Sequence, residues 1–437
     1  MKILFVWPRP PNLIFEEYNQ NRGILSDIMS KLLFFPKPLT FPILAAVTPK
    51  EHIVEITEGG PRDIDYEEEY DLVGITLPTR YAIWAYEIAD EFRRRGKKVV
   101  LGGWHASALP EEAKQHSDSV VIGEAEETWP QLLKDFKNGK MKSFYYPERA
   151  VEPELIPHPL NMYSQGPLLG VQATRGCTYG CEFCAITNIK FGNIFRMRKI
   201  KDVIDEIQEL PDKVFNFHDN SLTINPDYTK KLFREMIELD KKFYAFGNID
   251  ILGKDEELLK LASEAGCVGW LIGFESISQE SINIIGKKTN IVQTYQSSVK
   301  KIHEYGMIIL GSFVFGFDGD KIDVFDKTDD FVRKSEIDVP DVMILTPYPG
   351  TPLFNRLEKE GRIITKDWNK YDNQQVVFEP KYMTRQELLE NSGTLYKEWY
   401  RWPTSIKRMI KSLRFGRRSF IETTMQSFYQ KLSKFQE

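Results

Sequence analysis

The sequence predicts an α/β protein with an N-terminal doubly wound parallel sheet, a second run of six βα units and a helical C-terminal extension. Short apolar segments alternate with helical patterns along most of the 437 residues, which is typical of parallel sheets. Hydrophobic residues make up 42% and charged residues 28% of the chain, as in ordinary globular proteins. The net charge of −5 gives no reason to expect a nucleic-acid partner. No window holds the ~18 uninterrupted apolar residues of a membrane-spanning helix.

The first domain is expected over residues 1–142. Its strand candidates are apolar segments that end at turn residues, and they lie at 3–9, 52–57, 71–76, 98–101 and 119–122. Helical patterns separate them at 40–48, at 80–95 and up to about residue 137. In doubly wound sheets ligands bind beyond the carboxyl ends of the strands. The candidate binding residues at these ends are Thr76, Leu77, Gly102, Gly103, His105, Gly123 and Glu124.

Two interpretations of the glycines at these strand ends are open. They could let the backbone approach a large planar ligand closely, because glycine has no Cβ. Alternatively, they only make tight turns between strand and helix. Residue spacing alone does not separate the two.

The rest of the chain divides into three predicted parts. Residues 143–167 carry five prolines and are expected to form an extended linker. Residues 168–384 hold six strand candidates, at 168–175, 214–219, 243–249, 268–275, 308–317 and 341–347, with helical patterns between them. Residues 385–437 are expected to be helical, starting with a helix over 385–400.

The most informative motif is a cluster of three cysteines, Cys177, Cys181 and Cys184, spaced C-x3-C-x2-C. Thiolates are soft ligands that suit zinc or iron–sulfur centres. A structural zinc site normally takes four protein ligands, and the fourth cysteine, Cys267, is distant in sequence and expected to be a buried core residue. Three sulfurs with one open position fit a [4Fe–4S] cluster.

This motif, with the aromatic Phe183 before its last cysteine, resembles the signature of the radical S-adenosylmethionine (SAM) superfamily. The resemblance implies that the three cysteines hold a [4Fe–4S] cluster whose open iron binds SAM, which one electron then cleaves to a 5′-deoxyadenosyl radical. It also implies that the six βα units form the partial (β/α)6, TIM-like barrel of this family. The cluster loop follows the first strand of these units, at the carboxyl end where barrel chemistry takes place.

Further SAM contacts are expected at the other strand ends. The stretch Gly273-Phe-Glu-Ser276 resembles the family segment that contacts SAM, which points to Glu275 and Ser276, and Asp219 ends the second strand. The alternative for Glu275 is an ion pair inside the barrel. The neighbouring His218 is interpreted as a histidine satisfied at a strand end.

The N-terminal domain, with Gly-Gly-x-His and Gly-Glu-x-Glu before the barrel, resembles the cobalamin-binding domain of B12-dependent radical SAM proteins. This implies cobalamin as a further cofactor. The motif Asp-x-His-x-x-Gly, whose histidine binds cobalt from below in many cobalamin proteins, does not occur in the sequence. His105, after the paired glycines, is either a corrinoid contact or a loop residue hydrogen-bonded to the backbone.

The resemblance to hopanoid and bacteriochlorophyll C-methylases implies methylation of an unactivated carbon, on a lipid, isoprenoid or tetrapyrrole substrate. The alternative is an oxidative cyclase of the anaerobic magnesium-protoporphyrin type. A methylthiotransferase is disfavoured, because that class needs three more cysteines in an N-terminal domain and none precedes Cys177. The expected electron donor is a ferredoxin or flavodoxin.

Residues 401–418 carry seven basic residues, no acid and interleaved apolar residues. This pattern predicts a basic amphipathic helix, which either contacts a membrane surface or packs on the barrel with a solvated basic face. Three clustered cysteines favour a reducing compartment. The expected location is therefore the cytoplasm, with peripheral membrane contact if the helix binds lipid.

Overall fold

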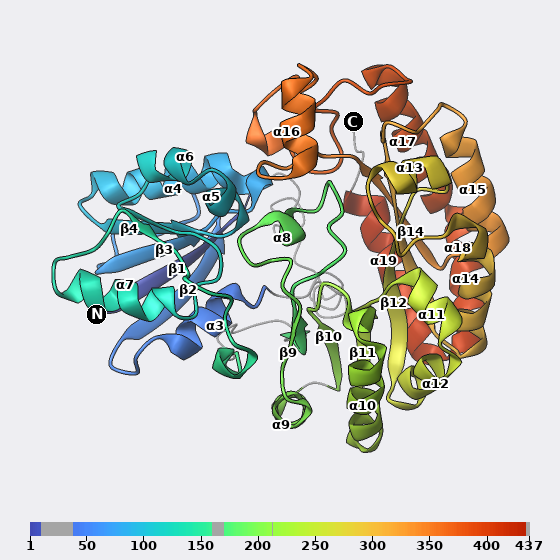
Figure 1. Ribbon diagram of the computed structural model, residues 1–437, viewed down its shortest axis with the longest axis horizontal. Coiled ribbons are helices and arrows are strands. Elements are labelled where there is room, and N and C mark those ends of the chain that lie inside the picture. The colour runs from blue at the N-terminus through green and yellow to red at the C-terminus, as the bar shows by residue number, and fades with distance from the viewer. Residues whose placement is uncertain (10–37, 160–169, 212, 434–437) are drawn as a thin grey trace.

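A computed structural model describes residues 1–9, 38–159, 170–211 and 213–433 of the chain. Two parallel sheets lie side by side, and the segment that carries α8 lies between them (Figure 1). Predictions that fall on Pro10 and Pro11, on 160–169 and on 434–437 lie outside the described residues.

The N-terminal sheet has six parallel strands in the order β2-β1-β3-β4-β5-β6. Their bounds are β1 Lys2–Pro8, β2 Ile53–Gly59, β3 Leu72–Thr76, β4 Lys98–Gly102, β5 Ser119–Val121 and β6 Phe144–Tyr145. The helices are α3 Thr40–Val47, α4 Ala82–Arg94, α5 Trp104–Ala108, α6 Pro110–Gln115 and α7 Thr128–Lys137.

Alternate side chains of β1 serve opposite faces of this sheet, as strand geometry requires. Leu4 and Val6 pack in a core with α4, whereas Ile3 and Phe5 pack in a second core with Trp129 of α7. The helices accordingly cover both faces, with α4, α5 and α6 on one and α3 and α7 on the other (Figure 1). The sheet is therefore doubly wound, as predicted.

One strand of this sheet differs from the prediction. Phe144 and Tyr145 lie in the segment expected to be an extended linker, yet they pair with Val120 and Val121 of β5. Their two aromatic side chains supply apolar surface at the sheet edge, and Tyr145 is 4% exposed. The proline-rich connection thus begins after β6.

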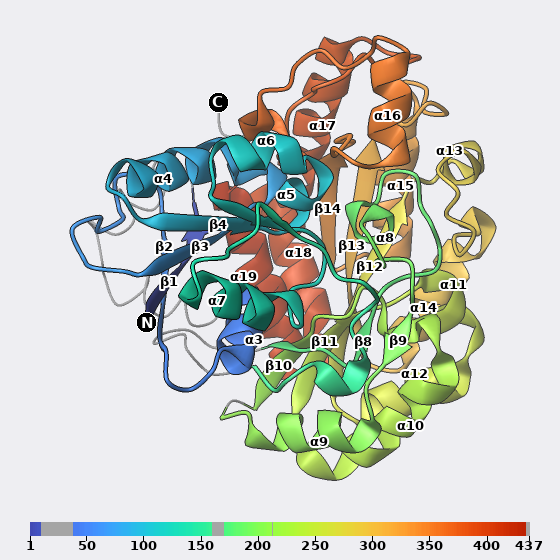
Figure 2. The same cartoon turned by 60° about the vertical axis from the view of Figure 1, so that its left-hand side comes forward.

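The second sheet is also six-stranded and parallel, in the order β14-β13-β12-β11-β10-β7, and it curves as an open partial barrel (Figure 2). The strands are β7 Gly170–Val171, β10 Val214–Phe217, β11 Lys242–Phe246, β12 Cys267–Glu275, β13 Ile308–Phe315 and β14 Val339–Ile344. The helices between them are α9 Ile200–Glu209, α10 Pro226–Met236, α11 Ile249–Lys254, α12 Glu256–Glu264, α13 Gln279–Ile284, α14 Tyr295–Glu304 and α15 Val324–Ser335. The sequence did not indicate α11.

The first predicted barrel strand, at 168–175, is divided in the structure. Only β7 joins the sheet, while β8 Thr174–Arg175 leaves it and pairs in antiparallel fashion with β9 Arg196–Met197. This hairpin forms the base of the loop that carries the three cysteines. The loop also contains α8 Ala185–Asn188.

The C-terminal region is helical and packs on the barrel. Its helices are α16 Pro352–Lys359, α17 Arg385–Tyr400, α18 Trp402–Ser412 and α19 Arg417–Ser433. Gly416, with a φ of 102°, separates α18 from α19, so the basic helix predicted over 401–418 is interrupted there. Among the described residues, no helix is both long enough and apolar enough to cross a membrane.

Candidate active site between the two sheets

The cysteine loop starts at a position that only glycine can occupy. Gly176 has a φ of 87°, and a Cβ there would lie 2.1 Å from the carbonyl oxygen of Ile194. The amide of Cys177 donates to Gly192 O at 2.9 Å, and the amide of Cys184 donates to Cys181 O at 3.1 Å. The loop is therefore folded back on itself and presents its three thiols from one short segment.

These thiols share one electrostatic environment. Burial raises the pKa of the Cys181 thiol to about 12, and it also raises the pKa of Cys177. The three thiols interact with one another and with the Lys287 ammonium. A metal centre would keep them deprotonated, since thiolate is the binding form.

The donor set fits an iron–sulfur cubane. The cysteines of a cubane bind separate irons, so their sulfurs stand farther apart than the ligands of a single ion. In the part of the chain that the structure describes, no group of three His, Cys, Asp or Glu side chains lies close enough together to hold a single metal ion. Cys267 supplies no fourth sulfur, because it is buried in β12 with its Sγ 3.6 Å from Gly269 O.

Glu275 lies at the end of β12 in a strained backbone conformation, with a φ of 61°. Such conformations concentrate at functional sites. Its carboxylate contacts the Nζ of Lys287, which also donates to Gly273 O at 2.9 Å. The structure thus contains the ion pair inside the barrel that was the alternative interpretation of Glu275. Its partner, Lys287, is a site residue that the sequence did not indicate.

Ser276 belongs to a buried network centred on Asp320. Its hydroxyl lies 3.4 Å from Asp320 Oδ1, which also accepts from Ser281 Oγ at 2.6 Å. The amides of Gly316 and Phe317 donate to the other carboxylate oxygen, both at 3.0 Å. Ser276 is 2% exposed, so in this conformation its hydroxyl belongs to the hydrogen-bond network inside the barrel.

Asp219 and His218, at the end of β10, face different partners. The Asp219 carboxylate accepts from the amides of Ala173 and Thr174 and from Thr174 Oγ1, and so orients the strand that leads into the cysteine loop. Burial raises the pKa of Asp219 to about 7, while these hydrogen bonds lower it. His218 instead lines a cavity, and its buried Nε2 has no hydrogen-bond partner among the described residues.

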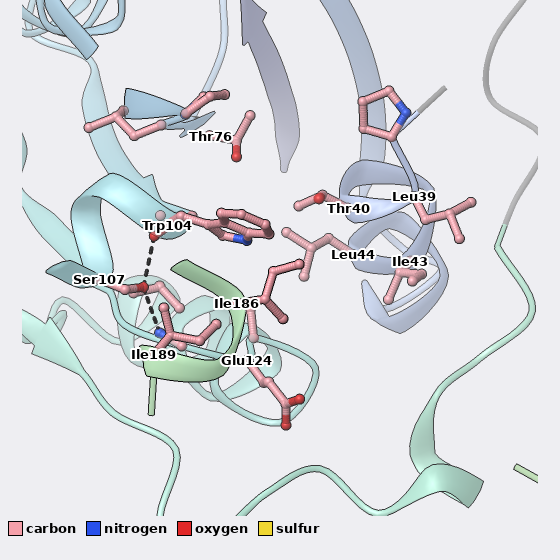
Figure 3. Close-up of a pocket in the computed structure, with 18 of the residues that line it drawn as sticks. Leu39, Thr40, Ile43, Leu44, Thr76, Trp104, Ser107, Glu124, Ile186 and Ile189 are labelled. Atoms are coloured by element: carbon pink, nitrogen blue, oxygen red, sulfur yellow. Dashed lines mark hydrogen bonds between the residues drawn. The ribbon is translucent and has the colours of Figure 1, made fainter. Parts of the chain in front are cut away.

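This cavity measures about 760 Å³ and lies between the carboxyl ends of the N-terminal strands and the cysteine loop. Six of the seven predicted strand-end residues line it, namely Thr76, Leu77, Gly102, Gly103, Gly123 and Glu124. The opposite wall includes Gly176, Ile186 and Ile189 of the cysteine loop. Figure 3 shows Trp104 in the middle, with Ile186, Ile189 and the α3 residue Leu44 around it.

The glycines of the cavity make tight turns. Gly103 has a φ of 93°, and a Cβ there would come within 2.8 Å of Thr76 Oγ1. Ser107 ties two of these turns together, because its Oγ donates to Gly103 O at 2.7 Å and accepts from the amide of Gly123 at 2.9 Å (Figure 3). The turn interpretation therefore holds for Gly103.

The cavity also suits a large planar cofactor. A Cβ at Gly102 would meet only ordinary contacts, the nearest at 3.5 Å. Trp104 is 49% exposed and offers a flat apolar surface. The volume lies within the range of cofactor sites, so the residues present fit a corrinoid.

His105 does not take part in this cavity. It is 1% exposed, and its Nε2 lies 3.2 Å from Glu112 Oε1 in a core that also contains Tyr86 and Trp368. The predicted corrinoid contact is therefore not formed. The alternative of a loop histidine bonded to the backbone is not met either, because His105 lies in helix α5 and its partner is the Glu112 carboxylate.

Glu124 lines the cavity, but its carboxylate is directed away from Trp104 (Figure 3). It forms a bidentate ion pair with Arg196, at 2.6 and 2.7 Å. Burial would raise the pKa of Glu124, but Arg196, Arg175 and the amide of Val151 together lower it. Arg196 is therefore a largely buried partner of Glu124, with a side chain that is 9% exposed.

Comparisons with known proteins support both halves of this site. The model of the radical SAM superfamily matches residues 171–332, and the model of the B12 binding domain matches residues 61–133. Bacteriochlorophyllide d C-12(1)-methyltransferase of Chlorobaculum tepidum is 36% identical over 356 residues, covering 78% of this chain and 77% of the relative. Bacteriochlorophyllide d C-8(2)-methyltransferase of the same organism is 33% identical over 399 residues, covering 84% and 86%.

A solved structure shares the fold. The radical SAM methyltransferase TsrM from Kitasatospora setae, with cobalamin and a [4Fe–4S] cluster bound, has a TM-score of 0.65 at 18% identity and covers 82% of this chain and 75% of its own. The arrangement of the two sheets thus recurs in that structure. The chain belongs to the family of radical SAM proteins with a B12-binding domain that includes the bacteriochlorophyllide d methyltransferases, and its cofactors are a [4Fe–4S] cluster, SAM and cobalamin.

Proposed function

We propose that this chain is a C-methyltransferase that adds a methyl group to an unactivated carbon of a tetrapyrrole. The observation that carries the proposal is the single cavity whose walls come from the B12-binding domain on one side and from the cysteine loop on the other. A substrate between them would meet both reaction centres. The two relatives that are named for bacteriochlorophyllide d support the substrate class.

The cysteines Cys177, Cys181 and Cys184 would hold the cluster, and the N-terminal strand ends would hold the corrinoid. When bound, these cofactors supply the cleavage of SAM and the methyl transfer. The chain itself supplies position and charge. Glu275 and Lys287 form a buried charged pair that can exchange its internal contact for the ammonium and carboxylate of SAM.

Further SAM contacts are proposed for Phe183, Ser276 and Asp219. Phe183 packs on the barrel core with its ring 6.0 Å from that of Phe317, which places an aromatic surface beside the last cysteine. Asp219 and Ser276 would act mainly through the backbone and the network that they hold. A ferredoxin or flavodoxin is the proposed electron donor.

The apolar wall of the cavity fits radical chemistry. Trp104, Leu44, Ile186 and Ile189 surround the central space (Figure 3). Such a wall keeps water away from a reactive intermediate and so limits side reactions.

Methyl-labelled SAM tests the proposal. The anaerobically purified holoenzyme is given SAM with a deuterated methyl group, a low-potential reductant and bacteriochlorophyllide d or related chlorins, and the products are analysed by mass spectrometry. A product that has gained the labelled methyl group supports methylation. A product that has lost hydrogen without gaining label identifies an oxidative cyclase and refutes the proposal.

We also propose that α18 contacts an anionic membrane surface. Its apolar residues face outward, with Trp402, Ile406 and Ile410 between 46% and 61% exposed, and Leu413 in the 3-10 turn that follows is 51% exposed. Its buried side carries Ser405 and Ser412 instead. Because the apolar residues recur every three or four positions, they form one stripe along the helix.

Basic residues accompany this stripe, which favours a lipid surface over a protein partner of mixed charge. Lys407 and Arg417 are exposed, while Lys411 and Arg414 pair with Glu336. The full-length protein is expected to co-sediment with vesicles that contain phosphatidylglycerol, and the double substitution I406S/I410S is expected to reduce this several-fold. Leu389→Ser, at a residue of α17 that is 42% exposed, is the matched control. Equal sedimentation of the three proteins would refute membrane contact.

A further inference from the structure

The turn that follows β5 reaches across to the base of the cysteine loop. It carries Glu124 and Glu126, which pair with Arg196 and Arg175 of the β8–β9 hairpin. Glu124 binds both terminal nitrogens of Arg196, at 2.6 and 2.7 Å, and Glu126 lies 2.6 Å from Arg175 Nη1. We call these two ion pairs the double clamp.

The hairpin places both arginines at one point. Arg175 and Arg196 are direct cross-strand partners in the β8–β9 register, and the whole cysteine loop, residues 176–195, lies between them. Both ends of the loop are therefore fixed when these two residues are fixed. The double clamp therefore joins the B12-binding domain to the two ends of the loop that would hold the cluster.

The surroundings favour a positioning role. The side chains of the double clamp are between 7% and 15% exposed, and two carboxylates face two guanidinium groups. A bidentate carboxylate–arginine pair fixes direction as well as distance. A third contact strengthens the arrangement, because Val151 donates its amide to Glu124 and accepts from Arg196 Nη1 at 2.8 Å.

Buried ion pairs contribute little net stability, because desolvation offsets their attraction, but they specify geometry. Two cofactors that are held on separate domains require a fixed distance and orientation between them. We propose that Glu124 and Glu126 are positioning residues that fix the separation between cluster and corrinoid by holding the base of the cysteine loop. This inference depends on the proposed function only through the presence of both cofactors.

Glu124→Gln and Glu126→Gln test the inference with little change in shape. Glu127→Gln is the matched control, since Glu127 lies in the same turn but pairs at the surface with Arg149, at 3.2 Å and with side-chain exposures of 39% and 62%. The holoenzymes are prepared with the reduced cluster and cob(II)alamin, both paramagnetic, and their magnetic coupling is measured by electron paramagnetic resonance.

The wild type and Glu127→Gln are expected to show one well-defined magnetic coupling between cluster and cobalt. The two clamp variants are expected to show a broadened distribution of this coupling, although their iron and cobalt contents equal those of the wild type. Hydrogen exchange on the cofactor-free proteins provides a second measurement that needs no cofactor. Amides of residues 176–195 are expected to exchange roughly tenfold faster in the clamp variants than in the control. A clamp variant with the same magnetic coupling as the wild type would overturn the inference. For a clamp variant that does not take up its cofactors, unchanged hydrogen exchange of residues 176–195 would overturn it. A wild type that binds no corrinoid would instead count against the proposed function.

Discussion

Removing the Asp219 carboxylate should destabilise the approach to the cysteine loop. Its two oxygens accept from the amides of Ala173 and Thr174 and from the hydroxyl of Thr174, at 3.2 Å for Ala173 and 2.5 Å for the hydroxyl. In Asp219→Ala the two buried amides lose their partner, at about 1–3 kcal/mol each. Because the hydroxyl can rotate to another acceptor, we expect a total loss of about 3–5 kcal/mol in the free energy of unfolding.

Asp219→Asn should fall between the wild type and the alanine variant. Its one carbonyl oxygen can keep both bonds from Thr174, but its amide group would face the N–H of Ala173, so we expect a loss of about 1–3 kcal/mol. Asp227→Ala, at a residue with an 88% exposed side chain, should stay within about 0.5 kcal/mol of the wild type.

Urea unfolding of the cofactor-free proteins measures these differences, and the iron content after reconstitution shows whether the loop still forms. We expect the iron content to fall in the same order as stability. An Asp219→Ala variant within about 1 kcal/mol of the wild type would refute the reasoning, because it would mean that the buried amides find other partners.

Three further predictions follow from other contacts. Serine at any one of the three loop cysteines should lower iron from about four per chain to under one, whereas Cys267→Ser should keep full iron because Cys267 lies inside β12; loss of iron in Cys267→Ser would contradict this assignment. Trp368→Phe should cost about 1–2 kcal/mol in urea unfolding, because the indole donates to Glu112 at 2.9 Å, and Trp368→Ala about 3–5 kcal/mol; a Trp368→Phe variant as stable as the wild type would mean that the hydrogen bond contributes nothing. Burial lowers the pKa of His218 to about 4, so the unfolded chain binds a proton near pH 6.5 that the folded chain does not. Asp219, whose pKa burial raises to about 7, acts in the opposite direction, so the His218 effect is measured as the difference between the wild type and His218→Asn. The stability of the cofactor-free wild type relative to this variant should fall by up to about 3 kcal/mol between pH 6.5 and 4, and identical pH profiles of the two proteins would refute the assignment.

Much of the fold could be predicted because it depends on local patterns. The helix over 385–400 was predicted with the bounds of α17, since Thr384 and Glu387 form a capping box at its start. Buried parallel strands such as β13 stand out as continuous apolar runs. The cluster motif is equally local, because all three cysteines lie within eight residues.

The misses depend on partners that are distant in sequence. Phe144 and Tyr145 form a strand only because β5 offers a free edge. His105 follows two cavity glycines, yet Glu112 and Trp368 draw its ring into the core. Glu124 lines the cavity, but the sequence did not indicate that its carboxylate pairs with an arginine 72 residues away, because no local pattern encodes that contact.

The central claim is that one chain presents an iron–sulfur cluster and a corrinoid to the same cavity. Anaerobic purification with added hydroxocobalamin, followed by metal analysis and an absorbance spectrum, tests it most directly. We predict about four irons and about one cobalt per chain, together with a corrinoid absorbance band. A chain that retains iron but no cobalt, or cobalt but no iron, would contradict the account.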